Sequence, residues 1–334
     1  MTGRVLTIGE TMLLLTGQGV GAVSDLEAVT VDTGGAESNV AIGLARAGVP
    51  VTWVGRVGTD PAGDRVLDDV AREGVDVIAV RDAERSTGIM MKERLDDGRT
   101  RVTYHRRGSA ASAFTPEDVP ASVVETAALV HVTGITLALS DSAADTVTAV
   151  LDRAEQSGVP VSFDVNHRPK LIDAETARAR YRDVVRRSDI VFAGDDEARL
   201  VLGRDEPGDD EDDADVLAHA LAAMARGRAV VKLGSRGAVA SIDGVLFRRS
   251  ATPVRVVDPV GAGDAFVAGW LAAALAGAAP TLALDRAADA GALACTVPSD
   301  WHRPDPAGLS GTDSPERVDH AERVDHAVHD RVDR

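Results

Sequence analysis

Residues 258–269, DPVGAGDAFVAG, decide the fold of this chain. A β-branched strand is expected at 255–257, followed by a tight turn and a helix from Asp264 to about residue 276. Backbone N–H groups in a turn of small residues can approach an anion, and the helix N-terminus adds partial positive charge. The turn residues are Gly261, Ala262 and Gly263. A carboxylate at Asp264 can then take a proton from an attacking alcohol; the alternative is that Asp264 only caps the helix.

The rest of the chain alternates short apolar strands with helices of 10–15 residues, which predicts an α/β fold with a doubly wound, mostly parallel sheet and helices on both faces. Strands are expected at 5–8, 51–58, 129–132, 159–163, 189–192 and 229–233, and helices at 34–48, 60–74, 141–157, 174–187 and 215–226. The segments 11–33 and 87–107 interrupt this alternation with short alternating stretches. They predict a small lid of antiparallel β-strands built from two insertions.

Composition excludes several classes of protein. The net charge of −17 and the pI of about 4.8 disfavour binding to nucleic acid or to anionic membranes. No apolar run approaches the ~18 residues that cross a bilayer, and the N-terminus lacks a secretory pattern. A single cysteine, Cys295, agrees with a reducing compartment, so a cytoplasmic protein is expected. The acidity fits a salt-adapted cytoplasm or, alternatively, an ordinary acidic protein from a GC-rich genome.

The C-terminal tail differs from the rest of the chain. RVDHAE at 317–322 is repeated as RVDHAV at 323–328. The apolar content is too low to offset the entropy of ordering, so residues 309–334 are expected to be a disordered extension of a single domain at 1–308. A histidine-rich metal-binding tail is the alternative.

Two further stretches, GGAESNVAIGLARAG at 34–48 and VGRVGTDPAGD at 54–64, together with 258–269, resemble the two signatures of the pfkB family of carbohydrate kinases. The resemblance covers about residues 3–300. It implies a ribokinase-like sheet with a β-lid, an anion hole made by the turn at 261–263, Asp264 as the catalytic base, and ATP with Mg²⁺ as cofactors. The P-loop pattern GxxxxGK[ST] is absent from the sequence.

Other positions follow from the same resemblance. VKLGSRG at 231–237 resembles the segment that holds the nucleotide, which implies roles for Lys232, Gly234 and Gly237. Residues 194–197 resemble the family's NxxE segment, so Glu197 is expected to hold Mg²⁺ through water, although Gly194 replaces the asparagine. The alternatives are a plain strand exit with a glycine turn and an acidic helix start.

Within the family, the likeness is greatest to kinases of 2-keto-3-deoxygluconate. It implies substrate contacts from Gly35, Asn39, Tyr104, Arg106, Asn166, Arg168 and Asp300. A sugar acid needs a cation near its carboxylate, which Arg106 and Arg168 can supply in bidentate form. The alternatives are a surface lid residue and a loop salt bridge. Met90 stands where a lid tyrosine is expected, which leaves gluco or galacto preference open.

The leading expectation is therefore an ATP-dependent kinase that phosphorylates the C6 hydroxyl of 2-keto-3-deoxygluconate or its galacto isomer. Another pfkB kinase, such as a fructokinase, ribokinase or nucleoside kinase, is the alternative within the enzymes. A non-catalytic sugar sensor would not need the base, and a Rossmann oxidoreductase would need a G-x-G-x-x-G after the first strand, where GETMLLLTG stands. Small molecules are the expected partners, with a homo-oligomer formed through the lid edge.

Overall fold

The computed structural model describes residues 3–95, 99–204 and 213–297. The expected tail at 309–334 and Asp300 lie outside the described residues. Within them, no helix has both the length and the apolar character needed to span a membrane.

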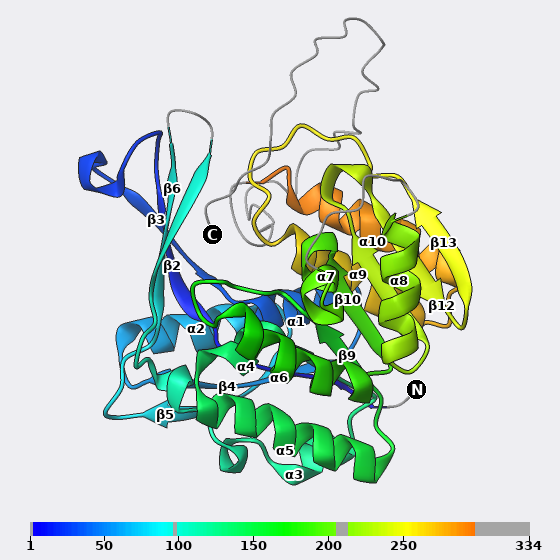
Figure 1. Cartoon of the computed structure of the whole chain (residues 1–334). Helices are drawn as coiled ribbons and strands as arrows, with labels where there is room; N and C mark the ends of the chain where they lie inside the picture. The colour runs from blue at the N-terminus through cyan, green and yellow to red at the C-terminus, as the bar shows by residue number, and fades with distance from the viewer. Residues whose placement is uncertain (1–2, 96–98, 205–212, 298–334) are drawn as a thin grey trace, which may run out of the picture.

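A nine-stranded sheet forms the centre of the molecule (Figure 1). Across the sheet, the strands are β13 (Val245–Arg249), β12 (Ala238–Ile242), β11 (Arg228–Lys232), β10 (Ile190–Gly194), β9 (Val161–Asp164), β8 (Leu129–Thr133), β1 (Val5–Ile8), β4 (Val51–Gly58) and β5 (Asp76–Asp82). All neighbouring strands from β11 to β5 pair in parallel, whereas β12 pairs antiparallel with both β11 and β13. The strand order reverses between β1 and β8, which is where open α/β sheets place ligands.

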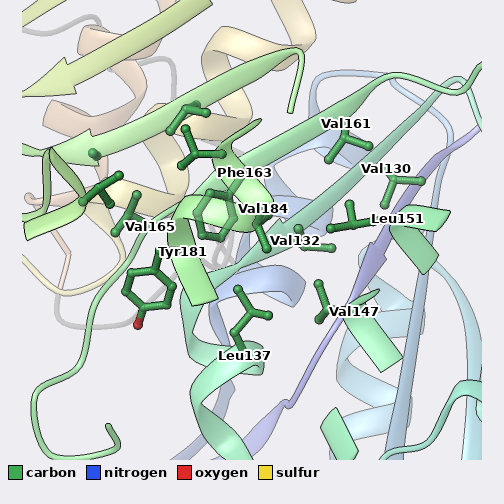
Figure 2. Packing of buried hydrophobic residues seen from close by; sticks show 14 of the residues in the cluster. Val130, Val132, Leu137, Val147, Leu151, Val161, Phe163, Val165, Tyr181 and Val184 are labelled. Atoms are coloured by element: carbon green, nitrogen blue, oxygen red, sulfur yellow. The ribbon is translucent and has the colours of Figure 1, made fainter. Parts of the chain in front are cut away.

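Helices cover both faces of the sheet, as expected from the alternation. One face carries α1 (Ala36–Arg46), α2 (Pro61–Arg72), α9 (Ala262–Leu275) and α10 (Pro280–Ala294). The other carries α3 (Ala121–Glu125), α4 (Gly134–Leu139), α5 (Asp141–Ser157), α6 (Ala174–Arg187), α7 (Asp195–Leu202) and α8 (Asp213–Met224). The second face is packed with aliphatic side chains around a few rings, of which Figure 2 shows Phe163 and Tyr181 beside Leu137 and Val184.

Local sequence explains where several helices begin and end. The Asp60 side chain accepts a hydrogen bond from Gly63 N and starts α2, with Pro61 at the first helical position. Ser140 caps α5 in the same way, and Gly158 ends it in the left-handed conformation with φ 68°. The turn between β12 and β13 is Asp243-Gly244, both at positive φ, which is typical of a two-residue hairpin.

A second sheet of four strands stands clear of the main sheet, in blue and cyan in Figure 1. In order across it, the strands are β3 (Val29–Gly34), β2 (Met12–Gly17), β6 (Ile89–Arg94) and β7 (Thr100–His105). This confirms the expected small second sheet, whose strands come from residues 12–34 and 89–105. As expected, β2 with β3 and β6 with β7 pair antiparallel, whereas β2 and β6 pair in parallel. β2 follows β1 and β6 follows β5, and β1 and β5 run in the same direction in the main sheet. β2 and β6 therefore both start from the carboxyl ends of these strands and run in one direction.

The expected strand at 255–257 is also absent. This segment pairs with no strand in the described part of the chain, and Val256 is 60% exposed. It is held by the Cys295 carbonyl, which accepts hydrogen bonds from Val257 N at 2.8 Å and Asp258 N at 3.2 Å. The helix that follows begins at Ala262, two residues earlier than expected.

Candidate active site

The polar residues of the candidate site lie where parallel strands end beside the switch point. Thr133, Asp164, Gly194 and Lys232 are the last residues of β8, β9, β10 and β11. The carboxyl ends of parallel strands meet at one edge of the sheet. The N-terminal turns of α1 and α9 contribute Asn39 and Asp264 to the same place, because these two side chains are hydrogen-bonded to each other.

The turn before α9 places Asp264. Gly261 adopts φ 83°, a left-handed conformation that favours glycine, and it occupies the N-cap position without any side-chain cap. Asp264 is therefore the third residue of the helix and does not cap it. Its Oδ2 accepts a hydrogen bond from Asn39 Nδ2 at 2.8 Å, and its Oδ1 accepts a longer one from Asn166 Nδ2 at 3.4 Å. The carboxylate is held by side chains from α1 and from the loop after β9.

The environment of Asp264 suits a proton acceptor. Burial raises the pKa of this carboxyl, the hydrogen bond from Asn39 lowers it, and the charge of Asp164 raises it further, while Arg168 and Lys232 lower it; the result is about 7. A base with a pKa near the working pH combines a useful ionised fraction with a useful driving force for proton transfer.

Lys232 lies beside the turn at 261–263. Its ammonium is 2.8 Å from both carboxylate oxygens of Asp164, and a Cβ built on Gly263 would be 3.6 Å from Lys232 Nζ. Burial lowers the pKa of Lys232, but the carboxylates of Asp164 and Glu197 raise it above its usual value, so the ammonium stays charged. A fixed positive charge next to backbone N–H groups at a helix start is well suited to bind phosphate. Gly234 is the first residue of the 3₁₀ turn η4 (Gly234–Arg236) just beyond β11, and Gly237 follows that turn as its C-cap.

The Glu197 side chain links the end of β10 to the loop after β9. Its Oε2 accepts a hydrogen bond from Gly194 N at 2.7 Å, and its Oε1 accepts one from His167 N at 2.8 Å. Among the described residues, no group of three or more His, Cys, Asp or Glu side chains could hold a metal by itself. A lone carboxylate with further lone pairs still fits Mg²⁺, which keeps most of its waters and is bound mainly through substrate phosphates.

Four of the expected sugar-binding residues lie at the start of α1 and on the lid, and two lie in the loop after β9. A Cβ on Gly35 would lie 2.3 Å from the Glu10 carbonyl oxygen, so glycine lets α1 begin against the end of β1. Arg106 is buried and forms an ion pair with Glu10, whose Oε1 also accepts a hydrogen bond from Ser109 at 2.6 Å. The Arg106 guanidinium is 5.7 Å from the ring centroid of Tyr104.

Among the expected sugar-binding residues, two buried polar atoms have no hydrogen-bond partner in the part of the chain that the structure describes. They are Asn39 Oδ1 and Arg106 Nε. Native proteins rarely leave buried polar atoms unpaired, so these two are suited to bind a polar ligand. Arg168 lies in the loop after β9, where its Nη1 donates a hydrogen bond to the His167 carbonyl at 3.1 Å. Its positive charge lowers the pKa of Asp164 and of Asp264.

The sequence interpretation did not single out Glu10 or Glu37. Glu37 is fully buried on α1, and its Oε1 accepts hydrogen bonds from Thr133 at 2.6 Å and Thr136 at 2.5 Å. Burial raises the pKa of this carboxyl. The available signal was an acidic residue one turn before Ala41, on a helix whose other charged residue is Arg46 at its exposed end.

Known proteins are similar to this chain in sequence and in fold. A family model described as "pfkB family carbohydrate kinase" matches residues 2–305. A "2-dehydro-3-deoxygluconokinase" of Bacillus subtilis is 35% identical over 301 residues, 88% of this chain and 90% of the relative. A "2-dehydro-3-deoxygalactonokinase" of Haloferax volcanii is 32% identical over 305 residues, 90% and 93% of the two chains.

A "fructokinase" of Klebsiella pneumoniae is 33% identical over 307 residues, 89% of this chain and 94% of the relative. Among solved structures, a 2-dehydro-3-deoxygluconokinase of Thermotoga maritima superposes with a TM-score of 0.84 at 26% identity, covering 90% of this chain and 96% of its own.

The ribokinase-like fold and these similarities define an ATP-dependent carbohydrate kinase, which transfers a phosphoryl group to an alcohol. The chain belongs to the pfkB family of carbohydrate kinases.

Proposed function

We propose that this kinase phosphorylates the C6 hydroxyl of 2-keto-3-deoxygluconate or 2-keto-3-deoxygalactonate, with Asp264 as the base. The observation that carries the proposal is the position of Asp264. It is a partly buried carboxylate with a pKa of about 7 in the first turn of α9, directly after the glycine turn and beside Lys232. The choice of a sugar acid is supported by the two relatives named for these substrates.

In the proposed reaction, Asp264 accepts the proton of the sugar hydroxyl as the hydroxyl oxygen bonds to the γ-phosphorus of ATP. The bond from that phosphorus to the β–γ bridging oxygen breaks, and ADP leaves with its electron pair. Backbone N–H groups of the turn at 261–263, together with Lys232, stabilise the negative charge on the transferring group. Glu197 would hold Mg²⁺ through water, and the charge of this ion would neutralise phosphate charge. Gly234 leaves open space for the nucleotide after β11, and Gly237 lets the backbone at 249–251 pass close to the same turn.

We assign recognition of the sugar acid to residues on both sides of the site. Asn39 and Asn166 hold Asp264 and face the reacting hydroxyl, and Gly35 allows close approach of the α1 N-terminus. Arg106 offers its unpaired buried Nε, but Glu10 already neutralises part of its charge. We therefore expect Arg168, on the core side, to carry more of the attraction for the carboxylate. Tyr104 packs against Arg106 and helps to orient it.

The test is a coupled ADP-release assay with 2-keto-3-deoxygluconate, 2-keto-3-deoxygalactonate, fructose and ribose. We expect kcat/KM for one of the sugar acids to exceed that of both neutral sugars. Asp264→Asn is expected to lower kcat about 10²–10⁴-fold while sugar binding persists. A preference for fructose, in line with the fructokinase relative, would replace the sugar-acid assignment by the alternative, whereas an active Asp264→Asn enzyme would remove the base.

Arg106→Ala and Arg168→Ala test how the carboxylate is recognised. Each is expected to lower kcat/KM for the sugar acid about ten- to a hundredfold, because a charge-assisted contact contributes about 1.5–3 kcal/mol. Turnover of any neutral sugar should change much less. Arg107→Ala, an exposed neighbour on the lid, is the matched control. Equal losses on acidic and neutral sugars would contradict the assignment.

The proposal has a cellular setting as well. We place the enzyme in the cytoplasm, where ATP is available and the single cysteine stays reduced. The outer strands of the lid sheet, β3 and β7, have open edges within the described residues. We propose that a homo-oligomer forms through these edges.

A further inference from the structure

A buried ion pair joins the lid to the body of the kinase. Lys92 on β6 places its ammonium 2.9 Å from Asp258 Oδ2, and the two side chains are 3% and 5% exposed. The partners are 166 residues apart in the chain. Arg94, on the same strand, donates from Nη2 to the Val257 carbonyl at 3.1 Å. Strand β6 is thus attached to the segment that leads into the turn at 261–263.

Asp258 also shapes that turn. Its Oδ1 accepts a hydrogen bond from Val260 N at 3.0 Å, and its own backbone N donates to the Cys295 carbonyl at 3.2 Å. One carboxylate oxygen therefore fixes the backbone immediately before Gly261, while the other receives the lid lysine. A displacement of Lys92 acts on the carboxylate that sets the geometry of the turn.

The position of Lys92 is unusual for a lysine. Along β6 the side chains alternate, and Met90 and Lys92 are both buried on one side of the strand. Met90 belongs to the apolar cluster of the lid with Met12 and Leu14. An ammonium in such a place is costly unless it is paired, because burial of an isolated charge is strongly unfavourable. The ion pair with Asp258 exists only when the lid lies against the body.

We infer that Lys92 is a positioning residue that couples lid closure to the anion hole. When the lid closes over the sugar, the Lys92 ammonium meets Asp258 and fixes the turn whose N–H groups face the transferring phosphoryl group. When the lid is open, Asp258 loses this partner and the turn is less restrained. Phosphoryl transfer is thereby favoured only after the sugar is enclosed, which protects ATP from hydrolysis by water. The inference rests on the proposed role of the turn at 261–263.

A double-mutant cycle tests the coupling. The variants are Lys92→Met, Asp258→Asn and the two combined; Asn keeps the acceptor for Val260 N but removes the negative charge. The substrate is the sugar for which the wild-type enzyme shows the highest kcat/KM among the four named above. We expect each single variant to lower kcat at least tenfold with KM for ATP within threefold, because an anion hole acts in the transition state. The double variant should lose no more than either single one.

Arg101→Met is the matched control. Arg101 lies on the neighbouring lid strand β7 and pairs at 2.5 Å with Glu93, so it stabilises the lid without touching the body segment at 257–261. Its kcat should stay within twofold of the wild type. Thermal unfolding of every variant separates loss of fold from loss of coupling, since a purely structural pair would lower Tm and leave kcat per folded enzyme unchanged.

The outcomes are distinct. A Lys92→Met enzyme that folds and keeps kcat within twofold overturns the inference, as do multiplicative losses in the double variant. If Lys92→Met alone does not fold because it leaves Asp258 buried and charged, the double variant, in which neither member of the pair is charged, decides: wild-type kcat contradicts the coupling and a reduced kcat supports it. Failure of the proposed function would appear differently, in the sugar preference of the wild type or in an active Asp264→Asn.

Discussion

Asp264 is held between opposing influences at the scale of a single residue. Burial and the neighbouring carboxylate of Asp164 favour its neutral form, whereas Asn39, Arg168 and Lys232 favour the carboxylate. A free surface aspartate would be fully ionised near neutral pH but too weak a base for an alcohol. The site raises the basicity of the group while still leaving a large ionised fraction.

This balance predicts the pH dependence of catalysis. Because the base must be ionised, kcat/KM should rise with pH through an apparent pKa of about 7 and level off above it. Asn39→Ala removes the hydrogen bond that lowers the pKa, so its midpoint should move to higher pH. Rates measured between about pH 5 and 9 check both statements. A midpoint near the usual pKa of a free aspartate, or an unmoved midpoint in Asn39→Ala, would contradict the role of the hydrogen bond.

The glycine turn and Asp264 were visible in the sequence because small residues before an acidic helix start form a local pattern. The partners of Asp264 were not derivable from local pattern: Asn39 and Asn166 are 225 and 98 residues away along the chain. The family resemblance named both asparagines as substrate contacts, but not their hydrogen bonds to the base. Glu10, which neutralises Arg106, was missed for the same reason, since its contact with the lid depends on how the two sheets are placed.

At the scale of elements, Arg56 on β4 connects two segments. It donates from Nε to Asp82 Oδ2 at 3.0 Å, at the end of β5, and from Nη1 to Asp118 at 3.2 Å in η3 (Pro116–Asp118). Asp82 also accepts hydrogen bonds from the backbone N–H groups of Glu84 and Arg85 at 2.8 and 3.0 Å. This buried carboxylate fixes the loop that leads from β5 toward the lid.

Acid should weaken this connection. Burial raises the pKa of Asp82, but the hydrogen bonds from Glu84, Arg85 and Arg56 outweigh it and lower the pKa to about 2. Because the folded pKa lies below the unfolded value of 3.8, the contribution to stability is fully present above about pH 4 and is lost as the pH falls toward 2. It amounts to about 2 kcal/mol. The acid-induced fall in unfolding free energy should therefore be shallower in Asp82→Asn than in the wild type; parallel curves would contradict it.

The hydrophobic periodicity of the sequence predicted the helices that pack on the main sheet closely, and α5 and α6 have the expected bounds. The directions of the strands and the strands at the sheet edges were harder to predict from the sequence. The strand expected at 255–257 has β-branched residues but no partner strand, and propensity alone does not supply one. The parallel pairing of β2 with β6 arises because the two insertions begin after β1 and β5, which run in the same direction. No local sequence pattern contains this information. The Asp243-Gly244 turn did offer a signal for the β12–β13 hairpin.

At the scale of the whole molecule, charge dominates the surface. A net charge of −17 makes the folded chain repel itself, and added salt screens that repulsion. We expect Tm to increase with KCl, by about 2–4 °C for each kcal/mol of added stability. Monodispersity should increase with KCl as well. Differential scanning calorimetry and light scattering measure both. A variant that lacks residues 312–334 should show the same response. Full stability and activity without salt would favour the ordinary acidic protein over a salt-adapted one.

The residues that hold the base also have a consequence for synthesis of the chain. Asn39 leaves the ribosome first, Asn166 later, and Asp264 follows Asn39 by 225 residues. At about 5–20 residues per second, that interval lasts roughly 10–45 s. During this interval α1 is completed and the lid strands β6 and β7 are added, but the proposed proton acceptor is still missing. On the proposed role of Asp264, we expect a translation product that stops short of α9 to transfer no phosphoryl group to a sugar, so that premature termination yields inactive fragments.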